Sequence, residues 1–303
     1  MDHGSDLTRC LGFTPVMRQG DAAQSLGVSR RKFQSLLADG VIVRAQRGVV
    51  VRSCIVTRAR ADRDMAHAVA LRTLLLVYED CVASHESAAF LLRLPLLRVP
   101  PHGIVTRERG AWRSGPTSRV RIAPLPPHHV LSEGDTRSTT VARAFVDIAR
   151  SAPFREAVVV GDATLRLGWE CAELQGVLDE CATWADVGKA RTALGFLDHR
   201  AESALESVSR AIMHEREVPP PELQVSIDAG AVHYRLDFFW RAQGVVGEPD
   251  GLAKYDDIAT LRAEKVRQER LERLGLRVVR WTFREMMVDT DETIARIRAA
   301  LLR

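Results

Sequence analysis

The sequence has no long apolar run. No stretch of its 303 residues approaches the ~18 consecutive apolar residues that a membrane-spanning helix needs, so we do not expect an integral membrane protein. Hydrophobic residues make up 46% of the chain and charged residues 27%. This balance excludes a disordered, collagen-like or fibrous protein. At ~150 residues per domain, the length predicts two domains, or three small ones.

Cysteine is scarce and scattered. The five cysteines, at positions 10, 54, 81, 171 and 181, form no CxxC pair, so we expect neither a disulfide framework nor a zinc knuckle. The first ten residues, MDHGSDLTRC, carry an acid at position 2 and no apolar segment, unlike a secretory signal or a transit peptide. These features favour the reducing cytoplasm.

Charge is unevenly divided along the chain. Residues 1–150 carry 22 Lys/Arg against 13 Asp/Glu, a net charge of +9, whereas residues 151–303 carry 21 against 26, a net charge of −5. Only four of the 43 basic residues are lysines, so arginine supplies most of the positive charge. A positive front half favours a polyanionic partner such as nucleic acid.

Residues 15–56 carry the pattern of a winged helix-turn-helix. Asp21 is placed to cap a short helix, Gly27 turns the chain, and Ser29 is placed to cap a second helix. The segments VIVRA and GVVVR then predict two strands around Gly48, which together form a wing. We therefore predict a winged helix-turn-helix domain over residues 1–60.

The second helix of this pattern has a basic outer face. Phe33, Leu36 and Leu37 recur at helical spacing and face the core, which leaves the basic side chains outside. A helix of this kind reaches base edges in the major groove while the wing approaches phosphates. Arg52 would also approach the phosphates. The predicted contacts to double-stranded DNA are Ser29, Arg30, Arg31, Lys32, Gln34, Arg44 and Arg47. The alternative is a small helix-hairpin domain whose cationic face is only solvated.

Residues 61–200 predict a mixed α/β domain. We expect helices over 62–78, 85–94, 138–151, 153–167, 170–182 and 186–195, and strands near 96–99, 103–107, 119–123 and 128–131. His128 and His129 are metal-ligand types, but neighbours on a strand face opposite ways, which favours a loop without metal. Ser84, His85 and Glu86 cannot align as a hydrolase triad at a helix start, so Ser84 is expected as an N-cap.

The first two thirds of the chain resemble a known family. The winged helix pattern is followed by ASHESAAFLLRLP at 83–95 and TTVARAFVDIARSAPFREAVVVGDATLR at 139–166. These segments, in this order, resemble actinobacterial AbiEi-type antitoxin proteins. The resemblance implies promoter binding by the winged helix, for autoregulation, through Ser29, Arg30, Arg31, Lys32 and Arg47. It also implies an antitoxin-like domain over 61–200 that neutralises a nucleotidyltransferase-like toxin.

Residues 201–303 predict the element order α-β-β-β-α-β. A helix over 202–214 precedes strands at ELQVSI, VHYRLDFFW and GVVGE, a charged helix over 258–274, a strand at LRVVRWTF and a last helix over 290–302. This order is the layout of restriction-endonuclease-like, PD-(D/E)XK-type nucleases. Glu206 on the first helix, Asp237 in the second strand, and Glu248 and Asp250 at the end of the third occupy the acidic positions of that layout.

These acids are suited to metal-dependent phosphodiester hydrolysis. Carboxylate oxygens hold Mg²⁺ or Mn²⁺, which activates water and neutralises charge at phosphorus. Asp237 and Glu248 are the predicted metal ligands, and Asp250 is a third. Glu206 would lie above them on the covering helix, and Lys254 or Lys265 would polarise water or stabilise developing charge. The alternative is that Asp237 pairs with Arg235 or Lys254 and binds no metal.

The last third of the chain also resembles a family. ALESVSRAIMHEREVPPPELQV, YRLDFFW, VVGEPDGLAKYDD and RLGLRVVRWTF resemble the endonuclease-like domain related to very-short-patch repair enzymes. Two positions depart from the wider superfamily. Its catalytic lysine usually follows the third-strand acid by two residues, where this sequence has Asp250, so Lys254 or Lys265 would have to substitute. Pro249 removes a backbone donor and belongs at a strand edge or a bulge.

Two functions are therefore expected. In the first, preferred one, a winged helix delivers a Mg²⁺-dependent endonuclease domain to double-stranded DNA. In the second, the chain is an antitoxin and transcriptional autoregulator whose nuclease-like domain is inactive and contacts a protein. Neither function involves a membrane.

Overall fold

The computed structural model describes residues 16–229, 232–250 and 258–302. Contacts divide the chain into two compact units, one formed by residues up to Ala152 with Glu170–Arg191 and one by Pro153–Trp169 with residues from Thr192 onward. The expectation of a mixed α/β chain with more than one domain is confirmed. The finer division into residues 1–60, 61–200 and 201–303 stays a prediction.

The first unit begins with a small antiparallel sheet and two short helices. Its elements are β1 (Val16–Arg18), α2 (Ala22–Ser25), α3 (Arg30–Ala38), β2 (Ile42–Gln46), β3 (Val49–Arg52), α4 (Ser53–Ala59) and α5 (Arg63–Val77), with strand order β1-β3-β2. Ser29 caps α3 as expected, because its hydroxyl accepts the Lys32 backbone N–H. Asp21 precedes α2 but makes no capping bond with its side chain. Phe33 is buried against Ile42 and Val50.

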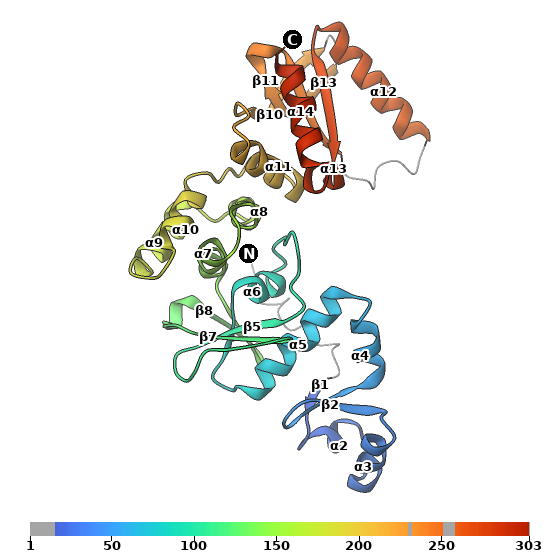
Figure 1. The fold of residues 1–303 in the computed structure, drawn as a ribbon, viewed down its shortest axis with the longest axis vertical. Coiled ribbons are helices and arrows are strands. Elements are labelled where there is room, and N and C mark those ends of the chain that lie inside the picture. Colours follow the sequence, from blue (N-terminus) through green and yellow to red (C-terminus); the bar gives the residue numbers. More distant parts are fainter. Residues whose placement is uncertain (1–15, 230–231, 251–257, 303) are drawn as a thin grey trace. The chain divides into compact units, whose positions relative to one another are not determined.

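A six-stranded mixed sheet forms the rest of this unit. Its elements are β4 (Val82–Ala83), α6 (His85–Leu91), β5 (Gly103–Arg107), β6 (Arg113–Gly115), β7 (Ser118–Ile122), η1 (Pro127–His129), β8 (Val130–Glu133), β9 (Thr136–Thr139), α7 (Val141–Ser151) and α9 (Cys171–Glu180). The strand order is β6-β7-β5-β4-β9-β8. Helix α5 packs on both sheets of the unit: Leu71 and Leu74 join the core of the large sheet, and Leu76 packs against the small one (Figure 1).

Several expected boundaries in this region are wrong. Residues 96–99 form no strand, because Pro95 and Pro100 bracket them and remove backbone donors. The strand expected over 128–131 begins at Val130, since the preceding residues form η1. The helix expected from 138 begins at Val141 after a strand, where the Thr140 hydroxyl caps it. Ser84 occupies the N-cap position of α6 but makes no capping bond with its side chain.

The second unit holds a four-stranded sheet with the predicted element order. Its elements are α8 (Phe154–Arg166), α11 (Ala204–Glu215), β10 (Glu222–Ala229), β11 (Val232–Trp240), η2 (Arg241–Gln243), β12 (Val245–Asp250), α12 (Ile258–Arg273), β13 (Arg277–Thr282), α13 (Phe283–Met287) and α14 (Thr290–Leu301); α10 (Val187–Leu194) spans the boundary between the units. The strand order is β10-β11-β12-β13, antiparallel except for the parallel pair β12 and β13. The order α-β-β-β-α-β is thereby confirmed.

Helices cover both faces of this sheet. On one face Val246 and Phe239 pack with Leu271 of α12. On the other face Trp281 donates its indole N–H to Ser209 Oγ of α11 at 2.8 Å. Residues alternate between these faces along β12, so Val246 and Glu248 point towards α12 and Gly247 points towards the tryptophan side.

Gly247→Ala is expected to destabilise the protein by about 1–3 kcal/mol, the usual cost of overpacking. A Cβ atom there would lie 2.7 Å from the ring of Trp281 and 3.0 Å from that of Trp240, and the Trp281 ring is held by its hydrogen bond. Gly176→Ala on α9 is the control, because a Cβ atom there meets nothing within 4 Å. Urea unfolding measures both variants. Equal stability of Gly247→Ala and the wild type would contradict the packing described here.

Candidate functional site

The outer face of α3 is exposed and basic. Arg30, Arg31, Lys32 and Gln34 are all exposed, and the helix contains no acidic residue between positions 30 and 38. The buried side chain of Phe33 fixes which face points outward. The short turn at Gly27, whose φ is +64°, sets α3 against α2, as expected for the second helix of a helix-turn-helix.

The hairpin of β2 and β3 adds two exposed arginines. Arg44 lies on β2 and Arg47 lies at the turn before Gly48, whose φ of +79° fits the tight connection. Arg52, at the end of β3, is exposed as well. Ser29 differs from the other predicted contacts, because its hydroxyl already accepts the Lys32 backbone N–H. In the structure, the Ser29 side chain caps the start of α3.

Two of the predicted acidic residues meet in a cleft of the second unit. Gln224 Nε2 donates to Glu206 Oε2 at 2.9 Å and lies 3.2 Å from Asp237 Oδ1. The capping residue Ser203 donates its hydroxyl to Glu206 Oε1 at 2.9 Å, which orients that carboxylate. The cleft has a volume of about 510 Å³. Its lining includes Glu206, Asp237, Tyr234, Arg235, Pro249 and Arg267.

Gln224 is a residue that the sequence analysis missed. It lies opposite Asp237, where the pairing of β10 with β11 skips a position between Leu223 and Val225. Its φ is +52°, a backbone conformation that residues other than glycine rarely adopt. Its amide oxygen is buried and has no hydrogen-bond partner among the residues that the structure describes. In the sequence, Gln224 is a polar residue between Leu223 and Val225. This alternation is common in strands and does not mark Gln224 as a site residue.

Glu248 is engaged separately from this pair. Its Oε1 accepts from Arg267 Nη2 at 2.6 Å and its Oε2 accepts from Arg280 Nη2 at 2.8 Å, and the residue is only 5% exposed. Because Glu248 points towards α12 while Gln224 joins Asp237 to α11, the described contacts link Asp237 to Glu206 rather than to Glu248. Arg267, which pairs with Glu248, also lines the cleft that contains Asp237.

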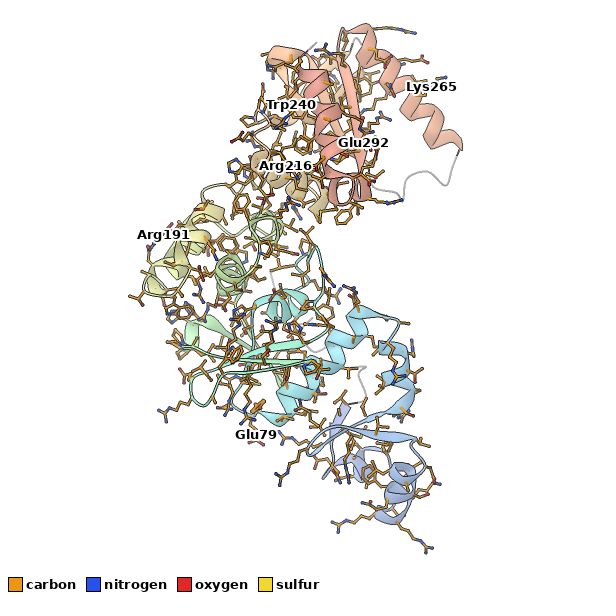
Figure 2. All side chains as sticks on the ribbon, viewed as in Figure 1. Glu79, Arg191, Arg216, Trp240, Lys265 and Glu292 are labelled. Carbon is orange, nitrogen blue, oxygen red and sulfur yellow. The ribbon has the colours of Figure 1, made fainter. Side chains whose placement is uncertain are left out.

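The remaining predicted residues lie around this cleft. Asp250 ends β12 and is partly buried. Pro249 lies beyond the last paired position of β11 and β12, although it still pairs with Trp281 of β13 on the other side. Lys265 is exposed on the outer side of α12 (Figure 2). Lys254 lies outside the described residues.

The donor atoms of the cleft fit a hard divalent cation. Glu206 and Asp237 contribute carboxylate oxygens to the cleft, the ligand atoms that such a cation prefers. In the structure, the Gln224 amide nitrogen donates to both carboxylates. Glu206 and Asp237 would therefore hold Mg²⁺, which would supply charge neutralisation at phosphorus, and Arg267 beside them carries the positive charge expected near a phosphate.

Comparisons with known proteins leave the family open. No protein-family profile matches the chain. The chain is similar to two curated proteins of Mycobacterium tuberculosis, uncharacterized protein MT2308 of strain CDC 1551 / Oshkosh and uncharacterized protein Rv2248 of strain H37Rv. Each is 32% identical over 155 residues, which is 50% of this chain and 55% of the relative. The match therefore spans about half the length of either relative. In the described part of the chain, no helix combines the length and apolarity needed to cross a membrane.

Proposed function

We propose that this chain binds double-stranded DNA through a winged helix-turn-helix. The observation that carries the proposal is the exposed basic face of α3 beside the β2–β3 hairpin, with arginines on both elements. The cap at Ser29 starts α3 next to Arg30 and Arg31, so these side chains lie at the end of the helix that reaches base edges. Arg44 and Arg47 on the hairpin are placed for the phosphate backbone.

Arg31→Ala is expected to weaken DNA binding by about 1–3 kcal/mol, roughly fivefold to 150-fold, because a base or phosphate contact is lost. Arg191→Ala is the matched control, since it removes the same charge from an exposed position away from α3 and the hairpin. Fluorescence anisotropy on genomic fragments, at several salt concentrations, measures both. Unchanged binding in Arg31→Ala, or an equal loss in Arg191→Ala, would rule out α3 as the recognition helix.

We further propose that the second unit is a restriction-endonuclease-like domain that hydrolyses phosphodiester bonds with Mg²⁺ or Mn²⁺. The Glu206–Gln224–Asp237 arrangement supports this activity, because two carboxylates converge in a cleft beside Arg267. The element order α-β-β-β-α-β supports it as well. Binding by α3 would then direct the hydrolytic domain to its substrate.

A regulator without nuclease activity is the second candidate. The observation that favours it is the double ion pair of Glu248 with Arg267 and Arg280, which occupies both oxygens of a predicted metal ligand. In this case the chain would act as an AbiEi-like antitoxin and autoregulator, with a nucleotidyltransferase-like toxin as its protein partner. Operator binding would then be its only activity on DNA.

Incubation of the purified chain with supercoiled plasmid separates the two candidates. With a nuclease, Mg²⁺ or Mn²⁺ produces nicked or linear product, and EDTA suppresses that product. With a regulator, no product forms although salt-sensitive DNA binding persists. The anisotropy measurement on the same preparation shows that the protein is folded and able to bind DNA in either case.

A further inference from the structure

His128 and His129 form a pair in the first unit that the sequence analysis assigned to a loop without metal. They do not lie on a strand: both belong to the single-turn helix η1, which brings their rings to 4.5 Å between centroids at an angle of 66°. Pro126 and Pro127 begin this turn and restrict its backbone, and the His129 N–H donates to Pro126 O. Because η1 is a helical turn, the two side chains are not forced to opposite faces as neighbours on a strand would be.

A carboxylate from a distant element completes the cluster. Glu180 ends α9, which is fixed by the buried side chains of Leu174 and Leu178. Its Oε2 lies 2.8 Å from His128 Nε2 and 3.3 Å from His129 Nε2. The three ligand atoms all lie within 4.8 Å of one another. Among the residues that the structure describes, this is the one group of three or more such side chains with that spacing.

We propose that His128, His129 and Glu180 bind a divalent transition-metal ion, with Zn²⁺ the best fit. Two imidazoles and one carboxylate are a ligand set that Zn²⁺ takes with a fourth position open to water. Bonds of about 2.0–2.1 Å in a tetrahedral site place ligand atoms about 3.3 Å apart, so the two contacts of Glu180 are close to the required spacing. Mg²⁺ prefers oxygen ligands, so we expect the carboxylate cleft of the second unit and this histidine site to prefer different metal ions.

The burial of the cluster suits a site that an ion enters from solvent. His129 is buried at 2% exposure, whereas His128 and Glu180 are exposed. The buried Nε2 atom of His129 has no hydrogen-bond partner of good geometry, although it points to Glu180. A metal ion between these atoms would give Nε2 a ligand role and would join η1 to the end of α9.

Arg143 is the charged neighbour that this site must accommodate. Its Nη1 lies 3.3 Å from His129 Nδ1 and also donates to Pro124 O at 3.2 Å. A metal ligand at Nε2 requires the proton of the neutral ring on Nδ1, so Arg143 would keep the Pro124 bond and release Nδ1. The charge of Arg143 is balanced by Asp147, whose Oδ2 lies 3.1 Å from Arg143 Nε.

Zinc titration of the full chain, after treatment with a chelator, tests the proposal by competition with a chromophoric zinc indicator. We expect the wild type to bind one more equivalent of Zn²⁺ than His128→Ala, with affinity at least about tenfold weaker in Glu180→Gln. Co²⁺ should give the absorption of a four-coordinate site in the wild type but not in His128→Ala. Both substitutions are at exposed positions, and circular dichroism confirms that each variant is folded.

His199→Ala is the matched control, because His199 is exposed and belongs to no cluster of three or more metal-ligand side chains among the described residues. It should bind zinc as the wild type does. Asp237→Asn should also leave the extra equivalent in place, which keeps this site independent of the proposed nuclease. Equal zinc binding by the wild type, His128→Ala and Glu180→Gln would overturn the proposal, and so would the absence of any binding by the wild type.

Discussion

Asp237→Asn is expected to lower Mg²⁺-dependent nicking of supercoiled plasmid by about 10²–10³-fold, because the loss of a charged ligand removes several kcal/mol of metal-assisted stabilisation. The amide is nearly isosteric with the carboxylate and can still meet Gln224, so the fold should persist. DNA affinity should be unchanged, since α3 and the hairpin are untouched. Initial rates of nicking at saturating Mg²⁺, measured together with anisotropy, test both statements.

Two further variants show whether the effect belongs to the cleft. Asp228→Asn removes an exposed carboxylate from β10, the strand paired with that of Asp237, and it should leave nicking unchanged. Glu206→Gln should reproduce the loss, because Glu206 shares the Gln224 amide with Asp237. Cleavage that survives both Asp237→Asn and Glu206→Gln would show that the nuclease site, if present, lies elsewhere.

Glu248→Gln addresses the other predicted ligand. The substitution would remove the buried carboxylate charge that pairs with Arg267 and Arg280, so a loss of stability is expected along with any loss of nicking. Urea unfolding measured beside nicking separates the two effects. Full stability with abolished nicking would assign Glu248 to the metal instead of to the arginines.

A steep loss of stability below about pH 6.5 is the second expected result, and buried histidines are its cause. Burial lowers the pKa of His67 to about 4. The ring is held neutral by a chain of hydrogen bonds: Ile104 N–H donates to Ser87 Oγ, the Ser87 hydroxyl meets His67 Nε2 at 3.0 Å, and His67 Nδ1–H donates to Pro100 O. A protonated ring would reverse the middle bond, because Nε2 would then donate to Ser87 Oγ, and the buried hydroxyl proton would lose that acceptor.

His85 is a second histidine of the same kind. Burial lowers its pKa to about 4, and the neighbouring charges of Arg121 and Arg143 act in the same direction. Its Nδ1 lies 3.0 Å from Ser84 Oγ, which also accepts from Thr106 Oγ1 at 2.8 Å. These contacts are buried, so Ser84 and His85 form part of the core.

The direction in which stability changes with pH follows from the two pKa values. Each folded pKa of about 4 lies below the ordinary 6.5, so the unfolded chain takes up protons first as the pH falls. Stability is therefore full above about pH 6.5 and declines from there to about pH 4, by roughly 1 kcal/mol per pH unit for each histidine.

Urea unfolding midpoints between about pH 7.5 and about pH 4.5 measure this decline. His67→Gln should flatten the slope over that range, because the amide can satisfy part of the bonding without titrating. His199→Gln, at an exposed position, is the control. A slope that His67→Gln leaves unchanged would show that other groups cause the acid instability.

Local patterns predicted the elements that depend on short-range chemistry. The cap at Ser29 and the spacing of Phe33, Leu36 and Leu37 predicted where α3 lies. Gly48, between two apolar segments, predicted the hairpin. The order of elements in the second unit followed from alternation and helical periodicity in the same way. The strand over 136–139 was missed, and it pairs with β4, a distant segment that local pattern does not indicate. The error at 96–99 is different, because Pro95 and Pro100 are visible in the sequence itself.

By itself, the sequence determined that acids lie on α11, β11 and β12 and that basic side chains line α3, because these placements require only periodicity. Tertiary structure alone decided which of those acids meet. The irregular pairing at Gln224 joins Asp237 to Glu206, whereas strand alternation turns Glu248 towards Arg267 and Arg280. It also brought Glu180 to the two adjacent histidines across a gap of about fifty positions in the chain. Side-chain contacts depend on packing between elements, and packing has no local signature.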